Sequence, residues 1–201
     1  MSALDAGLLL LGLVVGLTLA SHGAQKAFGW FDGPGMQGWT SAVAGMGFYP
    51  AAPFATAAML AELLGGLGLA LGFLTSIAAA MVVAQSIVII FHVHWRHGFW
   101  NTERGIEYPL LLGVVALFLG IVGRGLLSAD GLLSSPLSLL SGGLAPGHSV
   151  VPPMTVRVAL LLGGVIAGSL ALAAPRLAHI RRSPDRRGKR GDQVGKRGAA
   201  R

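Results

Sequence analysis

The chain has 201 residues, of which 53% are hydrophobic and 11% are charged, whereas soluble domains carry about a quarter charged residues, so the composition indicates an integral membrane protein. It contains no cysteine, which excludes disulfides, thiolate nucleophiles and cysteine-ligated metal or iron–sulfur sites. The net charge of +7 belongs mostly to a tail, because ten of the fifteen Lys and Arg residues lie in residues 176–201.

The first apolar run covers residues 6–20 and predicts a helix that continues to about Phe28. Such a helix is long enough to cross a bilayer, which takes about 20 residues. A cleaved signal peptide is the alternative, but the first five residues contain an acid and no base. We therefore expect a first membrane span.

Residues 31–52 are rich in glycine, proline and aromatic residues, and their only charged residue is Asp32. A segment this apolar is not expected to extend into water. Trp39, Phe48 and Tyr49 have the character of interfacial anchors. We predict a cap that lies on the membrane surface.

Two further apolar runs predict a second span over 53–73 and a third over about 77–94. Only Leu74, Thr75 and Ser76 separate them, so the two helices must form an antiparallel hairpin. Glycines and alanines in both runs would let the two backbones approach closely.

A fourth apolar run starts near Glu107 and ends near Gly123. The chain then divides into a connector, another apolar run and a basic segment with almost no apolar residue, a composition typical of disorder. The predicted organisation is a four-helix transmembrane domain at 5–123, an extramembrane connector at 124–155, a fifth, peripheral transmembrane helix at 156–175 and a disordered basic tail at 176–201.

The basic residues also predict an orientation. With five spans, the tail shares a membrane side with the loops at 31–52 and 95–106, and this side collects most of the Lys and Arg residues. By the positive-inside rule this side is cytoplasmic. We expect a multi-pass protein of the inner (plasma) membrane, with tail bases that contact anionic lipid headgroups at about 1 kcal/mol each rather than nucleic acid.

Three stretches carry a family resemblance: His22 to Gly35, Ala61 to Gly66, and Gly98 to Leu110. They are similar, in order and spacing, to the signature segments of the DoxX family of small bacterial membrane proteins. The resemblance covers about residues 5–123 and implies a compact four-helix membrane bundle, from which residues 124–201 depart. Some relatives are subunits of thiosulfate:quinone oxidoreductases, and others are linked to oxidative-stress complexes with superoxide dismutase and a sulfurtransferase. The resemblance therefore implies soluble redox enzymes as partners and quinone as a possible cofactor.

Polar side chains on the predicted helices mark a candidate site. Glu62 falls near mid-membrane, where an isolated carboxylate must be protonated, paired or wet. A rise of about 1.5 Å per residue places Gln85 within about 5 Å of the membrane depth of Glu62. The first span ends, and the fourth span begins, on the same side of the membrane as His92 near the end of the third span. The predicted pocket comprises His22, Gln25, Lys26, Glu62, Gln85, His92, Asn101 and Glu107.

Three interpretations of this pocket remain open. It is a structural clasp in which Lys26 pairs with Glu62 or Glu107, a site for a ligand or quinone headgroup, or, least supported, a metal site. No histidine pair has a dedicated carboxylate at metal-ligand spacing, so we predict no metal.

Two functions follow from these interpretations. The leading one is a noncatalytic membrane subunit or scaffold for redox or oxidative-stress enzymes, without catalytic activity of its own. The alternative is a subunit of a membrane oxidoreductase that binds quinone or another small ligand. A transporter is poorly supported, because the spans show no internal repeat.

Overall fold

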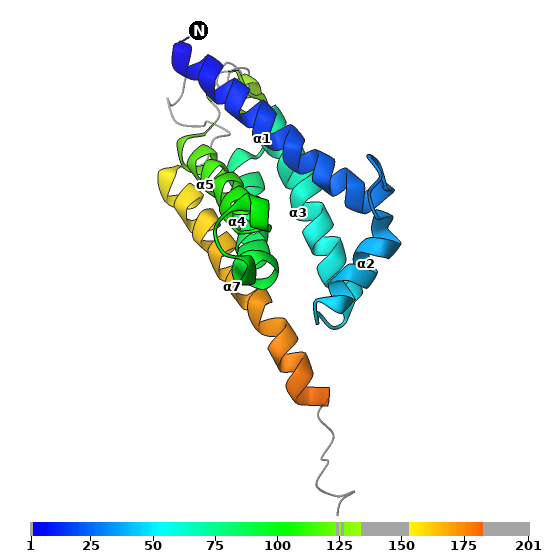
Figure 1. Ribbon diagram of the computed structural model, residues 1–201. Coiled ribbons are helices and arrows are strands. Elements are labelled where there is room, and N and C mark those ends of the chain that lie inside the picture. Colours follow the sequence, from blue (N-terminus) through cyan, green and yellow to red (C-terminus); the bar gives the residue numbers. More distant parts are fainter. Residues whose placement is uncertain (1, 124, 126, 134–152, 183–201) are drawn as a thin grey trace, which may run out of the picture.

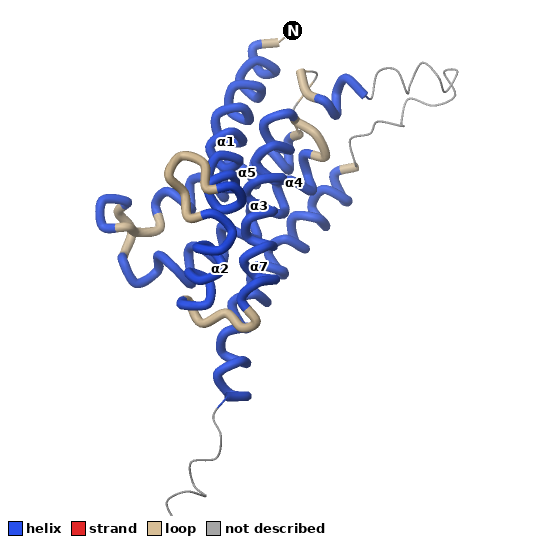
Figure 2. Tube along the Cα trace, turned by 90° about the vertical axis from the view of Figure 1, so that its right-hand side faces the viewer, coloured by secondary structure: helices blue, strands red, loops and turns tan. Residues whose placement is uncertain are grey.

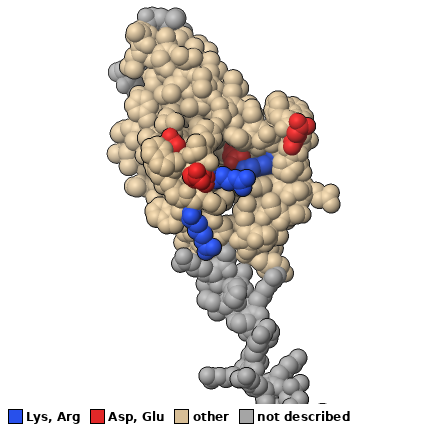
Figure 3. Space-filling model, in the orientation of Figure 1, with Lys and Arg blue, Asp and Glu red and all other residues tan. Residues whose placement is uncertain are grey.

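The computed structural model describes residues 2–123, 125, 127–133 and 153–182, which form an all-helical bundle without strands (Figures 1 and 2). Within these residues, four helices are long and apolar enough to cross a membrane, and a fifth apolar helix is shorter. Figure 3 shows that charged side chains on one face gather around the middle of the molecule, whereas the upper part is uncharged. Helices satisfy their own backbone groups, as a bilayer requires.

Helix α1 spans Ala3–Phe28, as the first apolar run predicts. It begins with a capping box, in which Ser2 Oγ accepts the Asp5 N–H at 3.1 Å and the Asp5 carboxylate accepts the Ser2 N–H at 3.0 Å. It ends at Gly29, whose φ of 74° suits a residue without a Cβ.

The predicted surface cap at 31–52 is instead built around a helix, α2 (Gly35–Gly45), which packs against α1 and α3. Phe48 is only 6% exposed and forms a small apolar cluster with Val43 and Ala55. Trp39 packs against the same cluster, and only Tyr49 is exposed. Phe48 is therefore a buried core residue rather than the predicted interfacial anchor, whereas Trp39 is half-buried and Tyr49 is exposed.

Helices α3 (Ala51–Leu71) and α4 (Thr75–Val88) form the predicted hairpin. The turn is two residues earlier than expected, since α3 ends at Leu71 and α4 begins at Thr75. Asp130 from the connector caps α4, and its carboxylate accepts the N–H groups of Leu74 at 2.8 Å and Thr75 at 3.0 Å. Beyond Val88 the helix widens into a π-helix, η1 (Ile89–His94), followed by the short 3₁₀ turn η2 (Trp95–His97).

The tightest backbone approach joins α1 to α3 rather than α3 to α4. A Cβ built at Gly16 would lie 2.4 Å from the backbone nitrogen of Ala70, and one at Gly66 would lie 2.4 Å from that of Ala20. Small residues at such positions are the usual means by which membrane helices pack closely. This contact places the middle of α1 against the C-terminal end of α3.

Helix α5 (Glu107–Val122) follows the 3₁₀ turn η3 (Asn101–Glu103), and α7 (Met154–Arg182) follows the connector. Helix α7 is less buried than the other long helices but packs closely on α4, since Cβ atoms at Gly164 and Gly168 would lie 2.5 and 2.7 Å from the carbonyl oxygens of Ala80 and Ala84. It also continues past Pro175, where we expected it to end. The predicted tail beyond residue 182 and most of the predicted connector lie outside the described residues.

The apolar core has two parts, and α3 passes through both. Ala55, Glu62 and Leu69 are spaced seven residues apart on one face of α3, with exposed fractions of 0%, 4% and 0%. Leu69 belongs to the main core and Ala55 to the cluster under α2. Glu62 thus lies between two apolar clusters.

Candidate functional site

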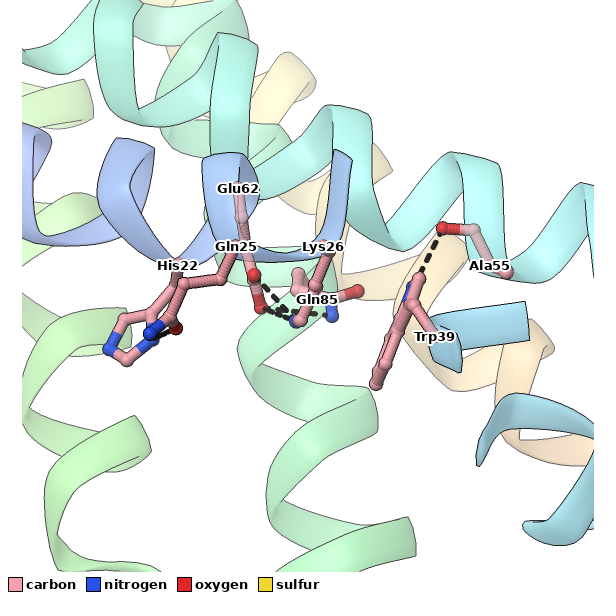
Figure 4. A network of polar contacts seen from close by, with 7 residues as sticks. All are labelled: His22, Gln25, Lys26, Trp39, Ala55, Glu62 and Gln85. Atoms are coloured by element: carbon pink, nitrogen blue, oxygen red, sulfur yellow. Dashed lines mark hydrogen bonds and ion pairs between the residues drawn. The ribbon is translucent and has the colours of Figure 1, made fainter. Parts of the chain in front are cut away.

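An ion pair between α1 and α3 forms the centre of the site. Lys26 Nζ lies 2.5 Å from both carboxylate oxygens of Glu62 (Figure 4). The Lys26 side chain is 16% exposed and that of Glu62 is 5% exposed. The helices can approach closely here because a Cβ at Gly23, one turn before Lys26, would lie 2.4 Å from the backbone nitrogen of Leu63. The predicted partner of Glu62 is therefore present.

Two further elements complete the surroundings of this pair. Gln85 on α4 donates from Nε2 to Glu62 Oε1 at 3.4 Å. Lys26 Nζ lies 4.2 Å from the ring centroid of Trp39, a cation–π contact, and the indole N–H of Trp39 donates to the Ala55 carbonyl at 2.9 Å. Figure 4 shows Lys26 between the carboxylate and the indole.

A cavity of about 210 Å³, which we call the polar cavity, adjoins the ion pair. Lys26, Glu62 and Gln85 form one wall, and α5 and the loop before it contribute to the opposite wall. The polar side chains of the lining are His22, Lys26, Glu62, Gln85, Ser86, His94, Asn101 and Tyr108. Three of these, Ser86, His94 and Tyr108, were not among the residues predicted from the sequence.

The two walls differ in how well their polar groups are satisfied. Within the residues that the structure describes, the Tyr108 hydroxyl and the Asn101 side-chain amide have no hydrogen-bond partner. His22 uses Nδ1 with Gln25 Oε1 at 3.3 Å, and His94 uses Nδ1 with the Arg104 carbonyl. Each ring keeps Nε2 for another partner. The wall formed by the ion pair is internally satisfied, whereas the opposite wall offers hydrogen-bonding groups to whatever occupies the cavity.

The structure brings together five of the eight predicted site residues: His22, Lys26, Glu62, Gln85 and Asn101. Gln25 lies beside His22 and donates to the Phe31 carbonyl at 3.3 Å, which secures the turn after α1. Glu107 does not pair with Lys26. Its carboxylate accepts the Asn101 backbone N–H at 2.9 Å and so fixes the loop before α5.

His92 does not join this group. Its Nε2 lies 2.8 Å from the Met46 carbonyl, and its ring centroid lies 4.6 Å from that of Phe48, on the side of α2. The expectation that His92 shares a face with Gln85 assumed an α-helix. Hydrogen bonds in the π-helix from Ile89 run to the fifth residue, so a spacing of seven no longer returns to the same face. His94 lines the polar cavity instead.

Comparison with known proteins finds a family match for part of the chain. Residues 7–95 match the model of the DoxX family. Over this segment, which is less than half of the chain, the protein is similar to the DoxX family. No curated protein and no solved structure matches the chain.

The matched DoxX segment contains one wall of the polar cavity but not the other. Lys26, Trp39, Glu62 and Gln85 lie within residues 7–95. Asn101 and Tyr108 lie beyond it, as does all of α7. The match is also shorter than the resemblance over 5–123 that the sequence motifs indicate.

Proposed function

We propose that this protein is a DoxX-family membrane subunit that binds the headgroup of a quinone in the polar cavity and serves soluble redox enzymes. The observation that carries the proposal is the cavity wall opposite the ion pair. There Tyr108 and Asn101 present hydrogen-bonding groups that no described residue satisfies. Polar groups next to hydrocarbon are costly unless water or a ligand satisfies them.

The charge of the lining supports a neutral ligand. Lys26 already contacts both carboxylate oxygens of Glu62, so it is not available to neutralise an anion. Quinone carbonyl oxygens are neutral acceptors, and the Tyr108 hydroxyl and the Asn101 side-chain amide are donors that suit them. His22 and His94 already donate from Nδ1 to the Gln25 and Arg104 oxygens.

The size of the cavity supports a single ring. A volume of about 210 Å³ is below the roughly 300–1,000 Å³ of sites that enclose a whole drug-sized ligand. The cavity therefore suits a headgroup whose remaining atoms lie elsewhere.

In this proposal the chain binds and orients the quinone, and electrons come from a partner enzyme. The sequence has no cysteine, so sulfur chemistry of the kind that the DoxX resemblance implies would belong to that partner. The cavity-lining residues Asn101 and Tyr108 lie at the loop end of the bundle, which is the cytoplasmic end in the orientation that we propose.

A noncatalytic scaffold for redox or oxidative-stress enzymes is the second candidate. The internally satisfied pair of Lys26 and Glu62 favours it, because this pair links α1 to α3 without needing a ligand. In that function water fills the polar cavity, and the protein acts only through its partners.

Quinone content after purification separates the two candidates. The chain has two tyrosines, so Tyr49→Phe, outside the polar cavity, is a matched control for Tyr108→Phe. We expect the unmodified protein purified from native membranes to retain quinone. Loss of one hydrogen bond in Tyr108→Phe should lower its occupancy about three- to tenfold, with an unchanged melting temperature, whereas Tyr49→Phe should match the unmodified protein.

Absence of quinone from the unmodified protein, or equal occupancy in both tyrosine variants, would reject the quinone site. Soluble enzymes that copurify in the same preparation without quinone would then support the scaffold.

A further inference from the structure

A second cavity, which we call the apolar cavity, lies next to the polar cavity and has a volume of about 410 Å³. Helices α2, α3, α4 and α7 line it, and α4 lies between α3 and α7 in Figure 1. Its walls are built from alanines and larger apolar side chains such as Phe48 and Phe54, and they include no charged residue. Its size falls within the range of ligand sites.

The two cavities are neighbours beside the ion pair. Gln85 and Ile89 line both. Trp39 lines the apolar cavity while its ring faces Lys26, which lines the polar cavity. A molecule that extends past Gln85 and Ile89 would therefore place one end among hydrogen-bonding groups and the other among hydrocarbon.

The apolar cavity also reaches the outer surface of the bundle. Ala57 and Leu60 on α3 line it and are exposed. In a membrane this apolar face of α3 contacts lipid chains, so an occupant can enter sideways from the bilayer. The absence of charge along this path excludes a water-soluble peptide or an anion as the occupant.

We propose that the apolar cavity holds the isoprenoid tail of a quinone whose headgroup lies in the polar cavity. This inference rests on the proposed function and extends it, because it names a membrane-embedded, long-tailed quinone as the ligand and a lateral route as its entry. Part of the tail site comes from Ala167, Gly168 and Ala171 of α7. Since α7 lies outside the matched segment, this chain adds a wall that the DoxX match does not include.

Quenching of Trp39 fluorescence can test the tail site, because quinones quench tryptophan and Trp39 lies where the cavities meet. The three other tryptophans, Trp30, Trp95 and Trp100, are exposed and can be replaced by Phe. The protein would be studied at full length in phosphatidylcholine nanodiscs. The probes are a decyl-tailed benzoquinone and the same ring without the decyl chain.

Two exposed alanines on α3 provide matched variants. Ala57→Phe adds a ring at the wall of the apolar cavity, whereas Ala52 is also exposed but does not line this cavity. We expect Ala57→Phe to raise the half-quenching concentration of the tailed probe about tenfold, because tail contacts are lost, and to leave the tail-less probe unaffected. Ala52→Phe should change neither value. Membrane partitioning is the same for all variants, so differences between them report on the site.

The possible failures are distinguishable. If the tail-less ring quenches Trp39 but Ala57→Phe and Ala52→Phe behave alike with the tailed probe, the proposed function stands and the tail site is wrong. Equal weakening of both probes by Ala57→Phe also overturns the tail site. If neither probe quenches Trp39 in the protein with Ala57 and Ala52 intact, the proposed function itself fails.

Discussion

The pair formed by Lys26 and Glu62 is the residue-scale feature with the largest expected effect on stability. Both side chains are mostly buried, and the removal of one partner from a buried pair typically costs about 3–5 kcal/mol, because a charge is left uncompensated. We therefore expect Lys26→Met to lower the melting temperature in detergent markedly. Arg96→Met, which removes an exposed base, should leave the melting temperature nearly unchanged.

A double variant separates the loss of the pair from the loss of lysine packing. If the unpaired Glu62 carboxylate causes the loss of stability in Lys26→Met, adding Glu62→Met should recover part of that stability. Replacing both partners of a buried pair by apolar residues is often neutral. Additive losses in the double-mutant cycle would contradict this account.

Sequence reasoning predicted the wall that contains the ion pair and, in the other wall, Asn101 but not Tyr108. The proximity of Lys26, Glu62 and Gln85 could be predicted from the rise of a helix and from the cost of an unpaired carboxylate in a membrane. The placement of His92 failed because nothing in the pattern indicated the π-helix. Tyr108 was missed because a tyrosine at the start of a membrane span has the ordinary character of an interfacial residue.

At the scale of helices, α7 offers a sharp test of packing, because two adjacent glycines have different surroundings. A Cβ at Gly164 would lie 2.5 Å from the Ala80 carbonyl oxygen, whereas a Cβ at Gly163 would have nothing within 4 Å. We expect Gly164→Ala to destabilise the protein by about 1–3 kcal/mol through overpacking. Gly163→Ala should be neutral or stabilising by about 0.5–1 kcal/mol, because alanine favours helices. Melting temperatures of the two variants in the same detergent provide the measurement.

An equal response of the two variants would show that α7 does not pack on α4 as described. The difference in melting temperature between the two variants remains informative even if both fold less efficiently, because the two substitutions are chemically identical and adjacent in sequence.

Hydropathy predicted that the long helices exist, but not how they associate. The runs of apolar residues located α1, α3, α4, α5 and α7 because a bilayer imposes both length and composition. Which pairs pack closely depends on which face carries glycine, and glycines occur on several faces of the same helix. Gly65 and Gly68 face α4, for example, whereas Gly66 faces α1. Helix α2 was missed because its small residues give a weak periodic signal.

The arrangement of the whole molecule depends on whether α7 crosses the membrane. Gly164 and Gly168 lie against Ala80 and Ala84 of α4, so the two helices run side by side along the apolar part of α4. If α4 crosses the bilayer, α7 must lie at the same depth and cross it too. Five crossings then place the N-terminal end of α1 and the C-terminal end of α7 on opposite sides.

Cysteine labelling can test this topology, because the chain has no native cysteine. With a membrane-impermeant maleimide on intact cells, Ala3→Cys should be labelled, and Glu103→Cys should be labelled only after the cells are opened. Ile166 on α7 is 58% exposed in the protein, yet Ile166→Cys should resist labelling throughout, because its surroundings are lipid rather than water. A reporter fused after Arg201 should be cytoplasmic, since ten bases in residues 176–201 resist translocation. Labelling of Ile166→Cys from water would remove α7 from the membrane, and labelling of Ala3→Cys and Glu103→Cys from the same side would overturn the orientation.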